Sequence, residues 1–64
     1  MNSDQDIRGN LFRVAVDHDQ KSAEYAKIAA ARLAELDFSA AATACHRAYQ
    51  HQLIARALGK QANL

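Results

Sequence analysis

The stretch LDFSAA, residues 36–41, is where this chain is most clearly predicted to turn. Asp37 and Ser39 each have a side-chain oxygen that can accept a hydrogen bond from a backbone amide two or three positions further on, which is how helices are commonly capped at their start. The whole sequence has two glycines and no proline, and it is rich in helix-forming residues. The stretch therefore predicts two helices joined by a short turn.

The segment before the turn has the spacing of a single amphipathic helix. Apolar positions recur at intervals of three or four, with two polar residues among them: Ile7, Leu11, Val14, His18, Ser22, Tyr25, Ala29, Leu33 and Leu36. We predict one continuous helix over residues 4–36, because Asp17 and Lys21 form a favourable pair one turn apart and no glycine or proline lies between them. The alternative is a break within residues 17–22, with a new helix capped by Asp17 or Asp19.

The segment after the turn is predicted to be a shorter helix over residues 39–58. Gly59 can adopt the left-handed conformation that closes a helix, and Arg56 and Lys60 are cations near the end of the helix dipole that favours them. The run LIARALGKQANL, residues 53–64, also resembles the start of a DNA-reading helix-turn-helix. Five residues follow the glycine, so we interpret the run as a capped helix end.

The composition indicates a single all-α domain, residues 1–64, with a small core. Fifteen of the apolar residues are alanines and four residues are aromatic, so one hairpin buries little apolar surface. Cys45 is the single cysteine, which excludes an intramolecular disulfide. The predicted fold is a two-helix antiparallel hairpin, and self-association into a homodimeric helical bundle is the expected source of further stability.

The N-terminal arm, residues 1–16, carries much of the large apolar surface. Five residues make up this surface: Ile7, Leu11, Phe12, Val14 and Val16. A second helix of about 20 residues from the same chain is too short to cover them. We therefore expect the arm to be a dimerisation or docking segment, unless its first turns fray.

The reactive and metal-binding side chains are few. Cys45 is expected to face an alanine-rich seam as a small buried residue, and Phe38 to fill the turn end of the hairpin. The other soft ligands are His18, His46 and His51. Neighbours such as Cys45 and His46 point about 100° apart on a helix, and residues five apart diverge as well. We expect no metal site, no cofactor and, without a base beside the thiol, no enzymatic activity.

The charges are unevenly distributed along the chain. All seven acidic residues occur at or before Asp37, whereas cations continue to Lys60. The second helix can therefore offer phosphate-binding and base-stacking side chains to a nucleic acid: Arg47, Tyr49, Gln50, His51 and Arg56. A dimeric nucleic-acid-binding regulator with weak, strongly salt-dependent binding is thus the alternative functional interpretation.

A further set of spacings surrounds the turn. A large residue early in the first helix is followed four positions later by a small one, an aromatic residue lies at the turn, and alanines recur in the second helix. The residues in these places are Tyr25, Ile28, Ala29, Phe38, Ala41 and Ala48. In this order residues 25–49 resemble a single tetratricopeptide hairpin. The chain departs from that family at Arg32, where an aromatic residue is preferred, and at Leu53, where proline is preferred. The resemblance implies a helical hairpin, and isolated repeats of this kind rarely fold because each unit stacks on a neighbour.

Two short stretches carry other resemblances. The sequence LAELD, residues 33–37, and a cysteine eight residues after Asp37 are similar to the repressor-of-primer proteins of colicin-type plasmids, which are dimers of helical hairpins that bind paired RNA loops. No RNA-contacting residue of that family can be placed on this chain. The run LIARALGKQ, residues 53–61, is similar to the tail of a small antirestriction protein of lambdoid phages. Together they imply a small accessory protein of a phage or plasmid.

The surplus apolar surface and the lack of pocket chemistry predict a small non-enzymatic protein–protein interaction module, of the phage or plasmid type that modulates a host protein. Its expected partners are a second copy of itself and a host or phage protein. The N-terminus MNSDQDIRGN lacks the basic and apolar regions of a signal peptide, and no apolar run approaches the about 20 residues that span a membrane. We therefore expect a cytoplasmic location without membrane contact.

Overall fold

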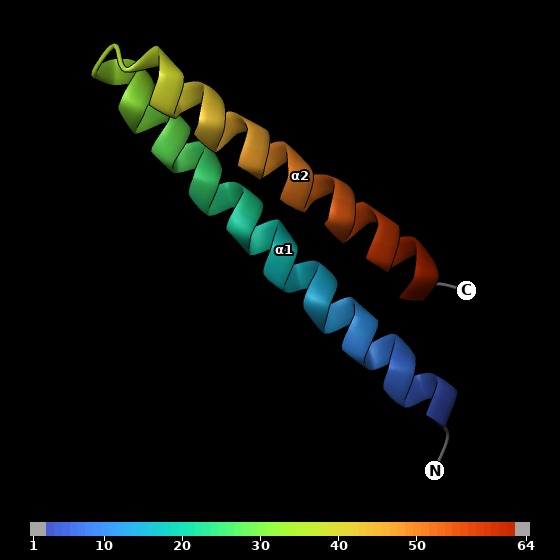
Figure 1. Cartoon of the computed structure of the whole chain (residues 1–64). Coiled ribbons are helices and arrows are strands. Elements are labelled where there is room, and N and C mark those ends of the chain that lie inside the picture. Colours follow the sequence, from blue (N-terminus) through green and yellow to red (C-terminus); the bar gives the residue numbers. More distant parts are fainter. Residues whose placement is uncertain (1–2, 63–64) are drawn as a thin grey trace.

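The chain folds into two long helices that lie side by side and run in opposite directions (Figure 1). The structure is a computed structural model that describes the backbone of residues 3–62 and the side chains of residues 6–62. Helix α1 comprises Ser3–Ala34 and helix α2 comprises Phe38–Ala62. The hairpin extends over 53 × 14 × 11 Å. The predicted all-α hairpin is confirmed.

Helix α1 runs without a break through residues 17–22, which confirms the predicted continuous helix and excludes the alternative break. His18 and Ser22, the polar residues on its apolar stripe, are half-buried on the side that faces α2. His18 meets a side chain of α2, His51, at hydrogen-bond distance. Packing along the whole length of a helix stabilises it more than local propensity does, so the polar interruption is accommodated without a break.

The turn closes α1 with a Schellman motif centred on Leu36. The amide of Asp37 donates a hydrogen bond to the carbonyl of Arg32, and the amide of Leu36 donates one to the carbonyl of Leu33, both at 2.9 Å. Leu36 has a φ of 62°, the left-handed conformation that glycine usually supplies at this position. Because this conformation cannot continue a helix, α1 ends at Ala34 and not at the predicted Leu36.

Asp37, one of the two candidates, is the N-cap of α2. Its Oδ1 atom accepts a hydrogen bond from the amide of Ala40 at 3.2 Å, and its backbone carbonyl accepts the first helical bond from Ala41 at 3.0 Å. Ser39 lies inside the helix, where its carbonyl accepts a hydrogen bond from the Thr43 hydroxyl at 3.1 Å. Helix α2 therefore begins one residue earlier than predicted.

The prediction that α2 ends at Leu58 with Gly59 as its cap is wrong. The helix continues through Gly59 to Ala62, and neither glycine of the chain has a positive φ. A glycine inside a helix costs about 1 kcal/mol relative to alanine. Packing of the last turns offsets this cost, since Leu58, Gly59 and Ala62 are all half-buried.

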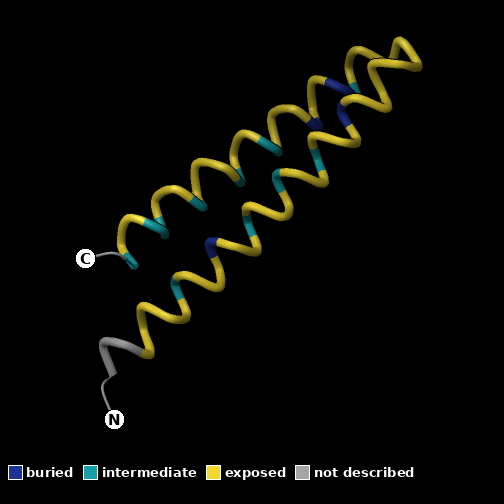
Figure 2. Tube along the Cα trace, turned by 180° about the vertical axis from the view of Figure 1, so that it is seen from behind, coloured by how far each residue is buried: buried dark blue, intermediate teal, exposed yellow. Residues whose placement is uncertain are grey.

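The buried and half-buried positions of the two helices face each other along a narrow seam (Figure 2). Most of the residues at these positions are small. On each helix the seam residues recur at alternating intervals of three and four, the heptad spacing of coiled coils. They are Leu11, Ala15, His18, Ser22, Tyr25 and Ala29 on α1, and Ala41, Ala44, Ala48, His51, Ala55 and Leu58 on α2. Every buried residue among side chains 6–62 is an alanine of this seam, so the two backbones lie close together.

Helix α2 reaches farther along the N-terminal arm than predicted, but four of the five large apolar residues of the arm stay exposed. With 25 residues, it places Leu58 beside Leu11 and Ala55 beside Ala15. Ala15 is buried and Leu11 is half-buried as a result. The arm is therefore part of the hairpin. Helix α2 reaches the arm because it continues beyond Gly59 to Ala62.

Candidate interaction faces

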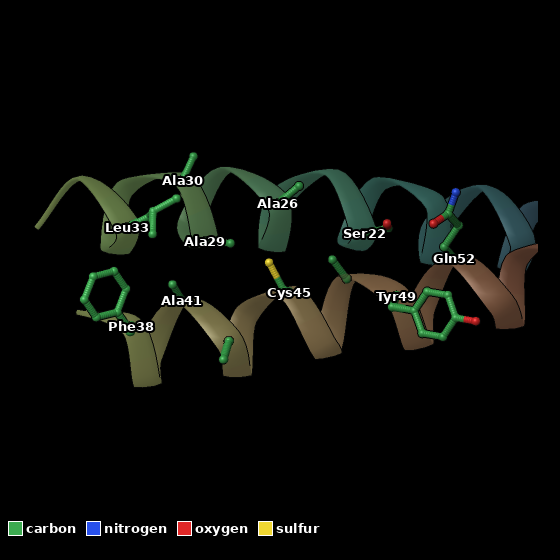
Figure 3. Close-up of a pocket in the computed structure, with 12 residues that line it drawn as sticks. Ser22, Ala26, Ala29, Ala30, Leu33, Phe38, Ala41, Cys45, Tyr49 and Gln52 are labelled. Atoms are coloured by element: carbon green, nitrogen blue, oxygen red, sulfur yellow. The ribbon is translucent and has the colours of Figure 1, made fainter. Parts of the chain in front are cut away.

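A shallow apolar groove of about 610 Å³ follows one face of the hairpin near its turn (Figure 3). Alanines of both helices form much of its surface, with Leu33 and Phe38 at one end and Tyr49 and Gln52 toward the other. Its full lining is Ser22, Ala26, Ala29, Ala30, Leu33, Phe38, Ala41, Ala42, Cys45, Ala48, Tyr49 and Gln52. We call the side of the hairpin on which it opens the groove face.

Two residues of the groove face contradict their predicted positions. Phe38 is 64% exposed and lines the groove, so it does not fill the turn end of the hairpin. Cys45 is exposed, whereas its neighbour Ala44 takes the buried seam position. Successive residues of a helix point about 100° apart, so a seam through Ala44 turns Cys45 to the side.

The groove face continues toward the open end of the hairpin. A second hollow of about 300 Å³ there is lined by Phe12, Ala15, Val16, Asp19, Ala55, Arg56 and Gly59. The residues of α2 that reach this face are spaced at alternating intervals of four and three: Phe38, Ala42, Cys45, Tyr49, Gln52, Arg56 and Gly59. Helix α2 thus has a second heptad stripe beside its seam, which is typical of helices that pack in a bundle of more than two.

The opposite side carries two apolar patches that charged residues separate. We call this side the polar face. Its hollows are lined by Tyr25, Ile28, Arg32, Ala40, Thr43, Ala44 and Arg47 near the turn, and by Ile7, Asn10, Leu11, Val14 and Leu58 near the open end. Asp17 and Lys21 follow Val14 at intervals of three and four, so charged residues separate the patches. The one ion pair among the described side chains, Arg32 to Glu35 at 3.1 Å, is exposed and stabilises little.

A cluster of aromatic and basic side chains interrupts the alanine seam. The Nδ1 atoms of His18 and His51 lie 2.7 Å apart, and the two rings meet edge to edge with centroids 5.0 Å apart and 28° between their planes. Tyr25 stacks on His51 at 5.6 Å and 7°, and the guanidinium carbon of Arg47 lies 5.9 Å from the centroid of the Tyr25 ring. We call these four residues the histidine cluster. Its central hydrogen bond requires one Nδ1 to donate and the other to accept.

The predicted docking residues of the N-terminal arm do not form one surface. Leu11 lies in the seam, half-buried. Phe12 and Val16, 61% and 39% exposed, lie on the groove face, whereas Ile7 and Val14, 56% and 43% exposed, lie with Leu11 on the polar face. The arm therefore extends both faces of the hairpin.

The residues predicted for nucleic-acid contact do not share one face either. Arg47 belongs to the histidine cluster, whereas Arg56 lines the open-end hollow of the groove face. Nine residues separate them, which places them half a turn out of phase on a helix. His51 points into the seam, Tyr49 is 58% exposed on the groove face, and Gln50 is exposed. These five residues are not brought together into a basic stripe.

Spacing within one helix does not reveal the pairing of His18 with His51. The available signal is that the two residues lie 17 and 16 positions on either side of Glu35, next to the turn. In an antiparallel hairpin, residues equally distant from the turn face each other when both lie on the seam stripe. His46, by contrast, lies off the seam and is exposed.

No protein-family model, curated protein or solved structure matches this chain. The resemblances at residues 25–49, 33–37 and 53–61 therefore stay predictions. In the described part of the chain, neither helix is long and apolar enough to cross a membrane. Among the same residues, no three or more His, Cys, Asp or Glu side chains gather where they could hold a metal ion.

Proposed function

We propose that this chain is a small non-enzymatic protein–protein interaction module of the cytoplasm, which works as a homodimer and modulates a partner protein as phage and plasmid accessory proteins do. The proposal rests on the contrast between a core of small residues and a surface with many large apolar ones. Every buried residue among side chains 6–62 is an alanine, while eleven large hydrophobic residues are exposed. Such a surface is typical of a small protein that is completed by association.

The exposed area of the chain supports association. The hairpin exposes 4965 Å² for a mass of 7.0 kDa. Compact monomers of that mass expose about 4000 Å², so this chain exposes about 900 Å² more. One partner in a standard protein–protein interface buries about 800 Å². The excess is therefore close to the area that one copy buries in a dimer.

The groove face is the surface that we assign to the second copy. Alanines line its middle, so two hairpins can approach closely, and Leu33, Phe38 and Tyr49 add large apolar side chains around them. Asp19 and Arg56 lie on the same face near the open end. In a two-fold symmetric pair, Asp19 of one copy can meet Arg56 of the other, so the charges of this face complement themselves.

The polar face keeps apolar side chains for a further partner. Ile7 and Val14 line its open-end hollow and remain exposed when the groove face is covered. Ile54 is 42% exposed and follows Arg47, which lines the turn-end hollow of the same face, at an interval of two helical turns. Apolar residues bordered by charges suit an amphipathic helix of a partner protein.

The surroundings of Cys45 support a non-enzymatic role. The thiol lies in a shallow groove lined mainly by alanines. That lining has no carboxylate, imidazole or amine that could take a proton from the thiol, and a nucleophilic cysteine needs such a base within hydrogen-bond reach. Cys45 is better suited to packing against the second copy.

The oligomeric state tests the assembly. Ala30→Glu places a carboxylate in the groove, while Ala31→Glu makes the same change at the next exposed position, about 100° around α1. We expect the wild type and Ala31→Glu to sediment as dimers, and Ala30→Glu to sediment as a monomer at the same concentration. A wild type that stays monomeric up to millimolar concentration, or two variants that behave alike, would refute the assignment.

Affinity capture tests the partner. We expect the tagged chain to retain one bacterial protein in stoichiometric amount, with or without nuclease treatment. Val14→Asp should lose that protein and remain dimeric, because Val14 lies off the groove face. Recovery of RNA or DNA, with all retained protein lost after nuclease, would contradict the proposal and support the nucleic-acid alternative.

A further inference from the structure

We infer that His18 and His51 form a site for one divalent transition-metal ion, with Zn²⁺ as its simplest occupant, that bridges α1 and α2. This site lies within one chain and does not rest on the proposed interaction function. The two Nδ1 atoms come from different helices and converge to 2.7 Å in a part-buried position. Imidazole nitrogens are preferred ligands of Zn²⁺, Ni²⁺ and Cu²⁺.

The sequence of the seam singles out this pair. One turn toward the open end, the matching seam positions are Ala15 and Ala55, which line one hollow and carry only methyl groups. An alanine or leucine pair would serve packing equally well at positions 18 and 51. Two facing imidazoles instead form a single hydrogen bond with each other and must keep their remaining nitrogens solvated. Packing alone therefore does not explain the choice of residues.

The surrounding structure holds the two rings in place. Small residues on both sides of the pair, Ala15 and Ala48 among them, keep the backbones close. The His51 ring is also stacked on Tyr25, at 5.6 Å and 7° between planes. Ligands carried by packed helices and oriented by neighbouring side chains lose little freedom when an ion binds.

The two rings must separate and turn to admit an ion. Zn–N bonds of about 2.0–2.1 Å at a tetrahedral angle separate two nitrogens by about 3.3 Å. From their 2.7 Å separation, the Nδ1 atoms of His18 and His51 must therefore move apart by about 0.6 Å. Because the two Nδ1 atoms point at each other, each ring must also turn by roughly 35° to direct its lone pair at the ion. Rotation about χ2, a broad torsion in histidine, supplies this movement. The donating ring moves its proton from Nδ1 to Nε2, so both Nδ1 lone pairs face the ion and a neutral pair loses no proton. Water fills the remaining coordination positions.

The charges around the pair are nearly balanced. Asp17 and Asp19 flank His18 in the sequence, and both carboxylates are exposed. On α2, the cation of the histidine cluster, Arg47, lies against the Tyr25 ring at 5.9 Å. Lys21, three positions after His18, is a second cation, so the site rests on the two imidazoles and not on a local excess of charge.

Titration with zinc chloride at near-neutral pH tests the site. We expect calorimetry to give one ion per chain, and thermal unfolding to shift upward by about 5–20 °C when free Zn²⁺ is about 10–100 times its dissociation constant, because the ion binds only the folded hairpin. His18→Gln and His51→Gln should each lose both effects. His46→Gln, at an exposed position of α2, is the matched control and should keep them.

Two further measurements keep the test decisive. Cys45→Ser should keep the binding, since the exposed thiol is not part of the site. In the wild type, nuclear magnetic resonance should show Zn²⁺-dependent shifts of the His18 and His51 imidazole signals and none for His46, even where the glutamine variants fold poorly. Unchanged His18 and His51 signals, loss of binding in His46→Gln or Cys45→Ser, or one ion per two chains would each overturn the inference.

Discussion

Replacing Leu36 by glycine should slightly stabilise the hairpin. Leu36 closes α1 at a φ of 62°, where a residue with a Cβ atom pays about 1–2 kcal/mol that glycine does not. Its side chain is 72% exposed, so truncation loses roughly a quarter of the about 2 kcal/mol that full burial of a leucine contributes. The greater freedom of glycine in the unfolded chain lowers the free energy of unfolding by about another 0.5 kcal/mol. The net gain for Leu36→Gly is therefore about 0.5 kcal/mol in the free energy of unfolding.

Leu36→Ala isolates the backbone contribution. Alanine loses the same side-chain contacts but keeps the left-handed conformation, so the glycine variant should be more stable than the alanine variant by about 1 kcal/mol. Urea unfolding followed by circular dichroism measures both, at one fixed protein concentration because association makes stability depend on concentration. Equal stabilities of the two variants would show that the left-handed closure carries no cost, and the reasoning from the Schellman turn would fail.

Three other substitutions test the helices and their seam. Gly9→Ala should raise the free energy of unfolding by about 1 kcal/mol in a urea titration, because Gly9 lies inside α1 and an added Cβ meets nothing within 4 Å; an unchanged midpoint would contradict this. Asp37→Ala should lower the melting temperature by removing the bond to the Ala40 amide, at a cost of about 1 kcal/mol, whereas Ser39→Ala should change it little; the reverse order would make Ser39 the cap. Ala44→Leu should destabilise by about 1–3 kcal/mol in chemical unfolding, since Ala44 is 5% exposed between close backbones; a more stable variant would show room in the seam.

The features that the sequence predicted correctly depend on neighbours within one or two helical turns. Asp37 caps an amide three positions away, and residue types alone reduced the candidates for this cap to Asp37 and Ser39. The continuity of α1 through residues 17–22 follows from the lack of glycine and proline there, and α1 is continuous. Short-range contacts such as these do not require knowledge of the partner helix.

The end of α2 was predicted wrongly because tertiary packing outweighs the weak local preference of Gly59 for a helix end. Gly59 favours a helix end by about 1 kcal/mol. The turns around and after it pack instead, leaving Leu58 and Ala62 half-buried. Residues at the opposite end of the chain supply that packing, and no window of sequence around Gly59 contains them.

Cys45 was misassigned by a single helical position. Five residues, Ala40–Ala44, include four alanines, so several neighbouring seams bury nearly the same amount of apolar surface. The turn selects among them, because each residue added to it rotates α2 by about 100° relative to α1. The left-handed Leu36 is not a conformation that the leucine itself predicts, and the seam position of Ala44, with Cys45 outside it, depends on that residue.

The alanine seam links the two proposals and also allows them to be separated. Alanine methyl groups keep the backbones close along the seam, Phe38 lies exposed outside it, and the rings of His18 and His51 meet inside it. The surface for the second copy and the metal site thus arise from the same close approach but involve different residues. Ala30→Glu should therefore abolish the dimer and still bind one Zn²⁺ per chain. If zinc binding disappeared together with the dimer, the two histidines would have to act between copies and not within one hairpin.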